Sequence, residues 1–113
     1  MNNIKHQIIN SIEDLDTCLQ HHSIVLLYVS QEECSVCHAI LPKLMKLLTN
    51  YPHIQFIQVD AKQVTEVVGR FLIFSVPTLI MFYEQKELFR EGRFVQFESL
   101  ENRVNQIYNS IAF

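Results

Sequence analysis

Two cysteines separated by two residues, Cys34 and Cys37, are the side chains whose type and spacing point most directly to chemistry. They lie between a run of apolar residues, 24–29, and a long pattern typical of a helix. The first turn of a helix has unpaired N–H groups and a partial positive charge, which stabilise a thiolate. We therefore expect Cys34 to be a low-pKa nucleophile. Cys37 lies one turn further on, where it can form a disulfide with Cys34 and resolve a mixed disulfide internally.

Other interpretations of this pair stay open on the residues alone. Residues 34–38 also spell a c-type haem attachment motif, which would require an exported protein and a distal ligand. A zinc site would need further ligands, and the spacing of the candidates fits no recognised pattern: His21, His22 and His53. The pair could also be two small buried hydrophobic residues. Its place at a helix start favours redox chemistry, with no metal and no cofactor other than the Cys34–Cys37 disulfide.

Length and composition predict one domain that spans residues 1–113. Of the 113 residues, 49% are hydrophobic and 19% are charged, which is enough apolar material for a core. The net charge of −3 provides no basic surface for nucleic acid and no basic run for an anionic membrane. The two glycines, Gly69 and Gly92, are too few and too far apart for a dinucleotide-binding fingerprint or a P-loop.

The sequence favours a cytoplasmic location. Its first residues show no cationic stretch followed by an apolar segment, as a signal peptide would. The longest apolar run, residues 24–29, is much shorter than the roughly 20 residues of a membrane-spanning helix. In a reducing compartment a close cysteine pair is more often catalytic or metal-binding than a permanent cross-link. The third cysteine, Cys18, is interpreted as a packing residue, with a regulatory thiol as the alternative.

Hydrophobic periodicity and turn signals predict an α/β domain with a mixed sheet and the element order β-α-β-α-β-α-β-β-α. The expected strands cover residues 24–30, 54–59, 77–83 and 87–90, with a short edge strand at Ile4, Ile8 and Ile9. The last two of the main strands form an antiparallel hairpin. The expected helices run from Ser11 as N-cap to about Gln20, from Val36 through Pro42 to Leu48, from Asp60 as cap to near Gly69, and from Phe97 to Ile111. Six phenylalanines are expected to be mostly core, the first or second of them flanking the site: Phe71, Phe74, Phe82, Phe89, Phe94 and Phe97.

The chain resembles the thioredoxin family over nearly its whole length. Three features carry the resemblance: the element order, the Cys34-Ser35-Val36-Cys37 motif at the start of a helix that contains Pro42, and Val76-Pro77-Thr78 at the start of a strand. The resemblance implies a thioredoxin fold, in which a central mixed β-sheet is flanked by helices. It implies that Cys34 is the nucleophile and Cys37 the resolving thiol. It also implies that Pro77 is a cis-proline facing the pair, and that the backbone of Val76 binds the substrate chain.

Four positions depart from the family's pattern and are expected to tune the redox chemistry. Glu33 stands where thioredoxins carry tryptophan, and its negative charge opposes a thiolate at the next residue and lowers the oxidising strength of the pair. The alternative for Glu33 is a solvated turn shared with Glu32. Ser35 and Val36 replace a Gly-Pro dipeptide. Tyr28 stands where the family has a buried aspartate that assists the resolving cysteine, and a tyrosine, with an ordinary pKa of about 10, is a poor base near neutral pH.

These observations together predict a thiol–disulfide oxidoreductase that reduces protein or small-molecule disulfides in the cytoplasm. The resemblance implies disulfide-containing protein substrates, and a reductase or low-molecular-weight thiol that reduces the cysteine pair again. The alternative comes from another functional class. It is a weakly active or redox-inactive interaction module that binds extended peptides in the groove around Cys34 and Pro77.

Overall fold

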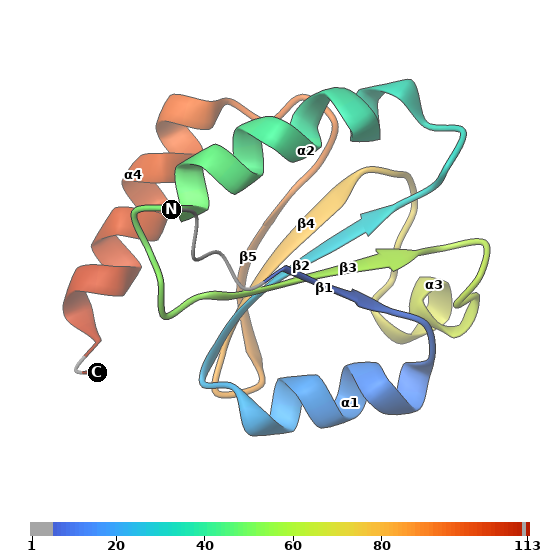
Figure 1. Ribbon diagram of the computed structural model, residues 1–113, viewed down its shortest axis with the longest axis horizontal. Coiled ribbons are helices and arrows are strands. Elements are labelled where there is room, and N and C mark those ends of the chain that lie inside the picture. Colours follow the sequence, from blue (N-terminus) through green and yellow to red (C-terminus); the bar gives the residue numbers. More distant parts are fainter. Residues whose placement is uncertain (1–5, 112) are drawn as a thin grey trace.

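In residues 6–111 and 113, which this computed structural model describes, five strands form one mixed sheet: β1 (His6–Ile9), β2 (Ile24–Ser30), β3 (Gln55–Asp60), β4 (Thr78–Tyr83) and β5 (Lys86–Glu91). Their order across the sheet is β1-β3-β2-β4-β5 (Figure 1). β1, β3 and β2 run parallel to one another, β4 is antiparallel to β2, and β5 is antiparallel to β4. The predicted mixed sheet and hairpin are confirmed, and β1 is the predicted edge strand, although Ile4 lies outside the described residues.

Within the same residues, four helices cover the sheet: α1 (Ile12–His21), α2 (Ser35–Leu48), α3 (Glu66–Arg70) and α4 (Phe97–Ser110). The first and third lie on one face of the sheet, and the second and fourth lie on the other (Figure 1). This order of elements is the predicted one. In the described part of the chain, no helix has both the length and the apolar character needed to cross a membrane.

The strand that leads to the cysteine pair, β2, is buried along its whole length. Its side chains alternate between the two faces of the sheet. Val25, Leu27 and Val29 pack in the core under α1 and α3, whereas Leu26 and Tyr28 pack in the core under α2 and α4. Burial on both faces explains why this strand is a continuous apolar run instead of an alternating one.

The helix that follows the pair, α2, is held by its apolar face. Cys34 is its N-cap residue, and Ile40 and Leu44 are among the residues that it buries against the sheet. The helix continues through Pro42 to Leu48, as the unbroken apolar face predicts. Because this packing fixes the helix on the sheet, it also fixes the position of the cysteines at its N-terminal end.

The predicted role of Asp60 is wrong. Asp60 ends β3, and its Oδ1 accepts the backbone N–H groups of Lys62 at 2.8 Å and Gln63 at 3.3 Å in the next turn. The N-cap residue of α3 is Thr65, several residues later. An aspartate side chain can accept hydrogen bonds from the backbone of a local turn as readily as it caps a helix. Here it accepts them from the turn.

The prediction for the phenylalanines is correct only in part. Phe82 is buried, but Phe74 and Phe94 are 91% and 83% exposed. Both exposed rings belong to connections, one before β4 and the other before α4. They therefore lie outside the layers in which helices cover the sheet, and an apolar residue type alone does not reveal this.

Candidate active site

The cysteine pair lies where β2 turns into α2. The turn is closed by the N–H of Cys34, which donates to the carbonyl of Gln31 at 3.1 Å. Cys34 then caps the helix, and its Sγ accepts the backbone N–H of Cys37 at 3.2 Å. The two cysteines form a disulfide, with their Cα atoms 5.2 Å apart. The sulfur of Cys34 therefore accepts a hydrogen bond from one of the N–H groups that a helix leaves unpaired at its start, as a stabilised thiolate would.

The two cysteines differ in their exposure to solvent. Cys34 is partly exposed, whereas Cys37 is only 3% exposed. A substrate meets the more exposed sulfur first, so the arrangement suits attack by Cys34 and resolution by Cys37. Of the residues between them, Ser35 is exposed, and Val36 is partly buried against the core under α2 and α4.

The segment before β4 lies next to the cysteine pair. β4 pairs with β2 so that Thr78 is opposite Val29. In an antiparallel pair, the residues before Thr78 therefore lie beside the turn that follows β2. The Val76–Pro77 peptide bond in this segment is cis. The hydroxyl of Thr78 donates to the carbonyl of Ser75 at 2.6 Å and holds the segment in place.

A shallow pocket of about 220 Å³ adjoins this segment. Its apolar part is formed by Leu72 and Phe74, which are 62% and 91% exposed. Gly92, which follows β5, lines the other side, and a Cβ atom there would lie 3.9 Å from the carbonyl oxygen of Pro77. Large exposed apolar side chains beside the segment that flanks a reactive pair suit contact with another protein chain.

Tyr28 is fully buried, and its side chain contacts the backbone of the resolving cysteine. The Tyr28 hydroxyl donates to the carbonyl of Cys37 at 2.6 Å. Burial raises the pKa of Tyr28 to about 12, so the hydroxyl keeps its proton near neutral pH. The ring lies against Phe56, with 6.2 Å between the ring centroids. Tyr28 therefore holds the first turn of α2 on the sheet.

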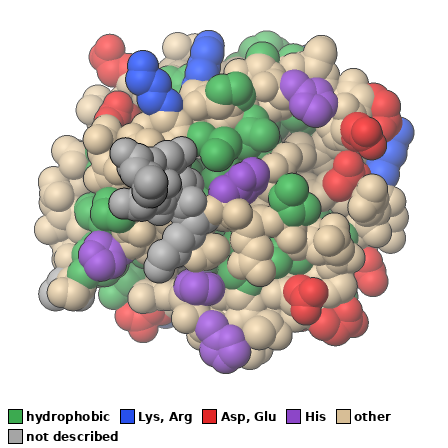
Figure 2. Space-filling model, in the orientation of Figure 1, with side chains coloured by type: hydrophobic (Ala, Val, Ile, Leu, Met, Phe, Trp, Pro, Cys, Tyr) green, Lys and Arg blue, Asp and Glu red, His purple; other side chains and the backbone are tan. Residues whose placement is uncertain are grey.

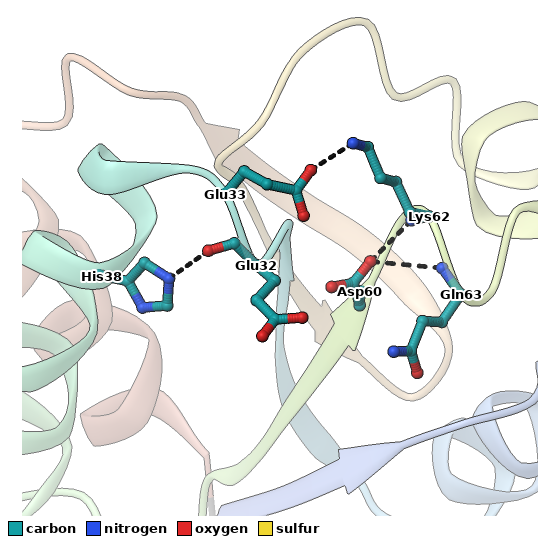
Figure 3. A network of polar contacts seen from close by, with 6 residues as sticks. All are labelled: Glu32, Glu33, His38, Asp60, Lys62 and Gln63. Carbon is teal, nitrogen blue, oxygen red and sulfur yellow. Dashed lines mark hydrogen bonds and ion pairs between the residues drawn. The ribbon is translucent and has the colours of Figure 1, made fainter.

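Charged side chains gather at the turn between β2 and α2. On the face shown in Figure 2, acidic side chains with a basic neighbour lie along the right-hand edge, over this turn and the end of β3. Glu33 forms an exposed ion pair with Lys62, and the carbonyl of Glu32 accepts a hydrogen bond from Nε2 of His38 at 2.6 Å. The two neighbouring carboxylates point in different directions, because that of Glu33 turns to Lys62 and that of Glu32 turns away from it (Figure 3).

A second cavity, of about 230 Å³, reaches Cys37 at the end of the sheet where β1, β3 and β2 stop. We call it the side cavity, and its lining includes six residues with polar or reactive side chains: Ser30, Glu32, Cys37, His38, Gln58 and Asp60. The amide of Gln58 donates to Oγ of Ser30 at 3.1 Å. The carbonyl oxygen of the same amide accepts a hydrogen bond from Nε2 of His6 at 3.0 Å. Polar groups from two adjacent strands therefore line part of this cavity.

Several residues near the pair were not predicted from the sequence. The parallel register of β2 and β3 sets Ser30 opposite Asp60, and the signal in the sequence was that each of these residues ends a predicted strand or directly follows one. Lys62 lies 29 positions from Glu33, and no local pattern indicates that the two will meet. In residues 6–111 and 113, no group of three or more His, Cys, Asp or Glu side chains is placed to hold a metal ion.

Comparisons with known proteins agree with this geometry. The family model described as Thioredoxin matches residues 7–106. The chain is 38% identical over 100 residues to the thioredoxin-like protein YdfQ of Bacillus subtilis (strain 168), covering 88% of this chain and 89% of the relative. Its structure is similar to that of oxidised thioredoxin O2 from Arabidopsis thaliana, with a TM-score of 0.82 at 20% identity over 92% of this chain and 95% of that one. For thioredoxin from Trypanosoma brucei brucei the TM-score is 0.79, at 21% identity over 88% of each chain. The predicted fold is confirmed.

Proposed function

The chain belongs to the thioredoxin family and is a thiol–disulfide oxidoreductase, and on this basis we propose that it acts as a reductant of protein disulfides. The observation that carries the proposal is the disulfide between a partly exposed helix N-cap residue, Cys34, and a buried residue, Cys37. Family membership implies, in general terms, disulfide-containing protein substrates and a partner reductase.

The reaction proceeds through two exchanges of disulfide bonds. The Cys34 thiolate attacks one sulfur of the substrate disulfide and forms a bond to it, and the other substrate sulfur leaves as a thiolate. Cys37 then loses its proton and attacks the sulfur of Cys34, which releases the first substrate sulfur and closes the Cys34–Cys37 disulfide. The substrate has gained two electrons and the protein has lost two. A reductase or a low-molecular-weight thiol returns them.

The surface beside the pair supports a protein substrate over a small-molecule one. Leu72 and Phe74 offer a substrate chain exposed apolar contacts next to Pro77. In this position the backbone of Val76 would bind an extended substrate segment, as the resemblance implies. We also propose the cytoplasm as the compartment, because a dithiol that reduces other proteins must itself be kept reduced.

Reduction of insulin disulfides by dithiothreitol, followed with and without the protein, tests this function. The wild type should accelerate the reaction, and Cys34→Ser should return the rate to that of dithiothreitol alone, because the attacking sulfur is gone. Without dithiothreitol, Cys37→Ser should accumulate a covalent adduct with insulin, and added dithiothreitol should remove it. Cys18→Ala is the matched cysteine control, because Cys18 is buried in the core under α1 and α3, and it should keep the activity.

One observation favours the alternative function. Exposed Leu72 and Phe74 would also suit an interaction module that binds extended peptides without turnover. The same variants separate the two functions. A wild type no faster than Cys34→Ser, with both proteins binding the same peptides, would identify the interaction module and overturn the proposed reductase.

A further inference from the structure

The side cavity connects the resolving cysteine to solvent by a path separate from the substrate surface. Cys37 forms part of its wall, whereas Cys34, Val76 and Pro77 do not. A volume of about 230 Å³ has room for several waters, since a water molecule takes roughly 30 Å³ in the liquid. The hydrogen-bonded side chains of Ser30 and Gln58 offer such waters polar partners.

The reaction requires a proton acceptor near Cys37, and this requirement rests on the proposed function. A thiol attacks only as its thiolate, so Cys37 must lose its proton before it can close the disulfide. Tyr28 is a buried polar group in contact with Cys37, but its hydroxyl proton is already donated to the carbonyl of that residue. Because burial raises its pKa to about 12, Tyr28 is not ionised at neutral pH and cannot take the proton.

Besides Cys37, three residues with titratable side chains line the side cavity: Glu32, His38 and Asp60. Asp60 uses Oδ1 to accept two backbone N–H groups. His38 uses Nε2 to donate to the carbonyl of Glu32 at 2.6 Å, so that nitrogen carries a proton. Among the described residues, the carboxylate of Glu32 has no hydrogen-bond partner, so both of its oxygens can bind water, whereas Asp60 has only Oδ2 and His38 only Nδ1 left for this.

The surrounding elements add no further titratable residue to the cavity lining. From β1 the cavity receives Ile8, which does not titrate, while His6 on the same strand bonds to Gln58. Lys62 and Glu33 pair with each other outside the cavity. Figure 3 shows the Glu32 side chain turned away from that pair, and Glu32 is among the residues that line the cavity.

We propose that Glu32 is the proton acceptor for Cys37 and acts through water held in the side cavity. The Cys37 proton passes to this water as the water gives a proton to the Glu32 carboxylate. The Cys37 thiolate then forms its bond to the Cys34 sulfur, the bond between Cys34 and the substrate sulfur breaks, and the substrate leaves as a thiolate. Glu32 returns the proton to solvent. His38 positions Glu32, because it holds the Glu32 backbone against the first turns of α2.

Stopped-flow mixing of the reduced protein with excess dithionitrobenzoate separates the two exchanges. The first phase, whose rate depends on reagent concentration, reports attack by Cys34. The second phase, which is independent of reagent concentration, reports displacement by Cys37. Glu32→Gln should leave the first phase within about twofold and slow the second at neutral pH by about tenfold or more, since general bases typically contribute 10²-fold or more.

Glu33→Gln is the matched control for the lost charge. It removes a carboxylate one position away that pairs with Lys62 and does not line the cavity. Any effect that acts through the field alone should appear in this variant too, so the second phase of Glu32→Gln should be slower than that of Glu33→Gln. In Glu32→Gln the second phase should also become proportional to hydroxide concentration, and added formate should restore part of its rate. Glu32→Asp should be faster than Glu32→Gln.

The outcomes separate this inference from the function on which it rests. Equal second phases in Glu32→Gln and Glu33→Gln, or no rescue by formate, would overturn the role of Glu32 and leave the reductase in place. A wild type without a first phase would overturn the proposed function and this proton route together.

Discussion

The two faces of the central sheet have different chemistry, although they share the same strands. On the face under α1 and α3, β2 contributes only Val25, Leu27 and Val29. On the face under α2 and α4, the same strand contributes Tyr28 and then Ser30, close to the start of α2. The cysteine pair and the polar groups that contact it lie on this second face or at its rim. One face therefore serves folding, while the other also positions the disulfide.

The polar groups of the second face can be buried because each has a partner. Tyr28 bonds to the Cys37 carbonyl, and Gln58 links Ser30 to His6. Among the described residues, no buried side-chain nitrogen or oxygen lacks a hydrogen-bond partner. A buried polar group without a partner typically costs about 1–3 kcal/mol, so these bonds make a reactive site compatible with a stable sheet.

Two adjacent leucines of β2 give the largest expected effects and test the division between the faces. Leu27 is 0% exposed under α1 and α3, and Leu26 is 1% exposed under α2 and α4. Leu27→Ala and Leu26→Ala should each lower the free energy of unfolding by about 2–5 kcal/mol, because each leaves a cavity in a packed core. Denaturant unfolding of the oxidised protein measures this loss.

The two leucine variants should differ in their chemistry. Leu26 packs in the same core as Cys37, so Leu26→Ala should change the rate at which a mixed disulfide is resolved. Leu27→Ala, studied under conditions where it is folded, should keep the wild-type rate. If Leu27→Ala changed the resolution rate as much as Leu26→Ala, the proposed separation of the two faces would be wrong.

The next largest effect is expected from Tyr28→Phe, which should change the free energy of unfolding in opposite directions at neutral and at high pH. Near neutral pH, Tyr28→Phe should lower the free energy of unfolding by about 0.5–1.5 kcal/mol, because the bond to the Cys37 carbonyl is lost. Burial raises the pKa of Tyr28 from 10.0 to about 12, so folding opposes its ionisation. The stabilisation that Tyr28 provides is complete below pH 10 and is lost as the pH rises toward 12.

This loss should reverse the order of stability of the two proteins. Above pH 10 the unfolded wild type gains stability from ionisation of Tyr28, by about 1.4 kcal/mol per pH unit, and Tyr28→Phe does not. Near pH 12, Tyr28→Phe should therefore be the more stable protein. Tyr51 and Tyr83 ionise in both proteins and cancel in the difference. Unfolding curves that keep the same separation from neutral to high pH would show that Tyr28 ionises as easily in the folded chain as in the unfolded one.

The framework of strands and helices is largely readable from the sequence. The alternation of β2 between two cores, the capping of α1 by Ser11 and the course of α2 through Pro42 all follow from local patterns. Ser11 accepts the N–H of Asp14 at 3.1 Å, the bond that its residue type predicts. These features depend on residues close together in the chain, and contacts between such residues need no particular arrangement of distant segments.

The face under α2 and α4, which we call the chemical face, is harder to predict from the sequence, because its contacts depend on register between distant segments. The sequence places Tyr28 on a buried strand, but only the packing of α2 sets its hydroxyl against the carbonyl of Cys37. Asp60 was predicted to cap a helix, and it instead caps a turn at the wall of the side cavity. Phe74 is likewise exposed because it lies in the connection before β4, outside the layers that the helices and the sheet form.

The smallest expected effects come from two exposed ion pairs. Lys62 pairs with Glu33 beside the cysteines, and Arg70 pairs with Asp16 between α3 and α1. Exposed pairs of this kind contribute little to stability, so Lys62→Ala and Arg70→Ala should both unfold almost as the wild type does. Their effects on the disulfide should differ, because only the first pair lies next to Cys34.

Without Lys62, the charge of Glu33 is no longer balanced and opposes a thiolate at the neighbouring Cys34. Lys62→Ala should therefore make the cysteine pair more reducing, by no more than about 15 mV, which corresponds to about a threefold change in its equilibrium with glutathione. Adding Glu33→Gln to Lys62→Ala removes the unbalanced charge and should return the potential toward the wild-type value. Arg70→Ala should leave it unchanged at any ionic strength. A shift of equal size in Lys62→Ala and Arg70→Ala would mean that the potential follows the net charge of the whole protein, and the special character of the chemical face would not extend to its rim.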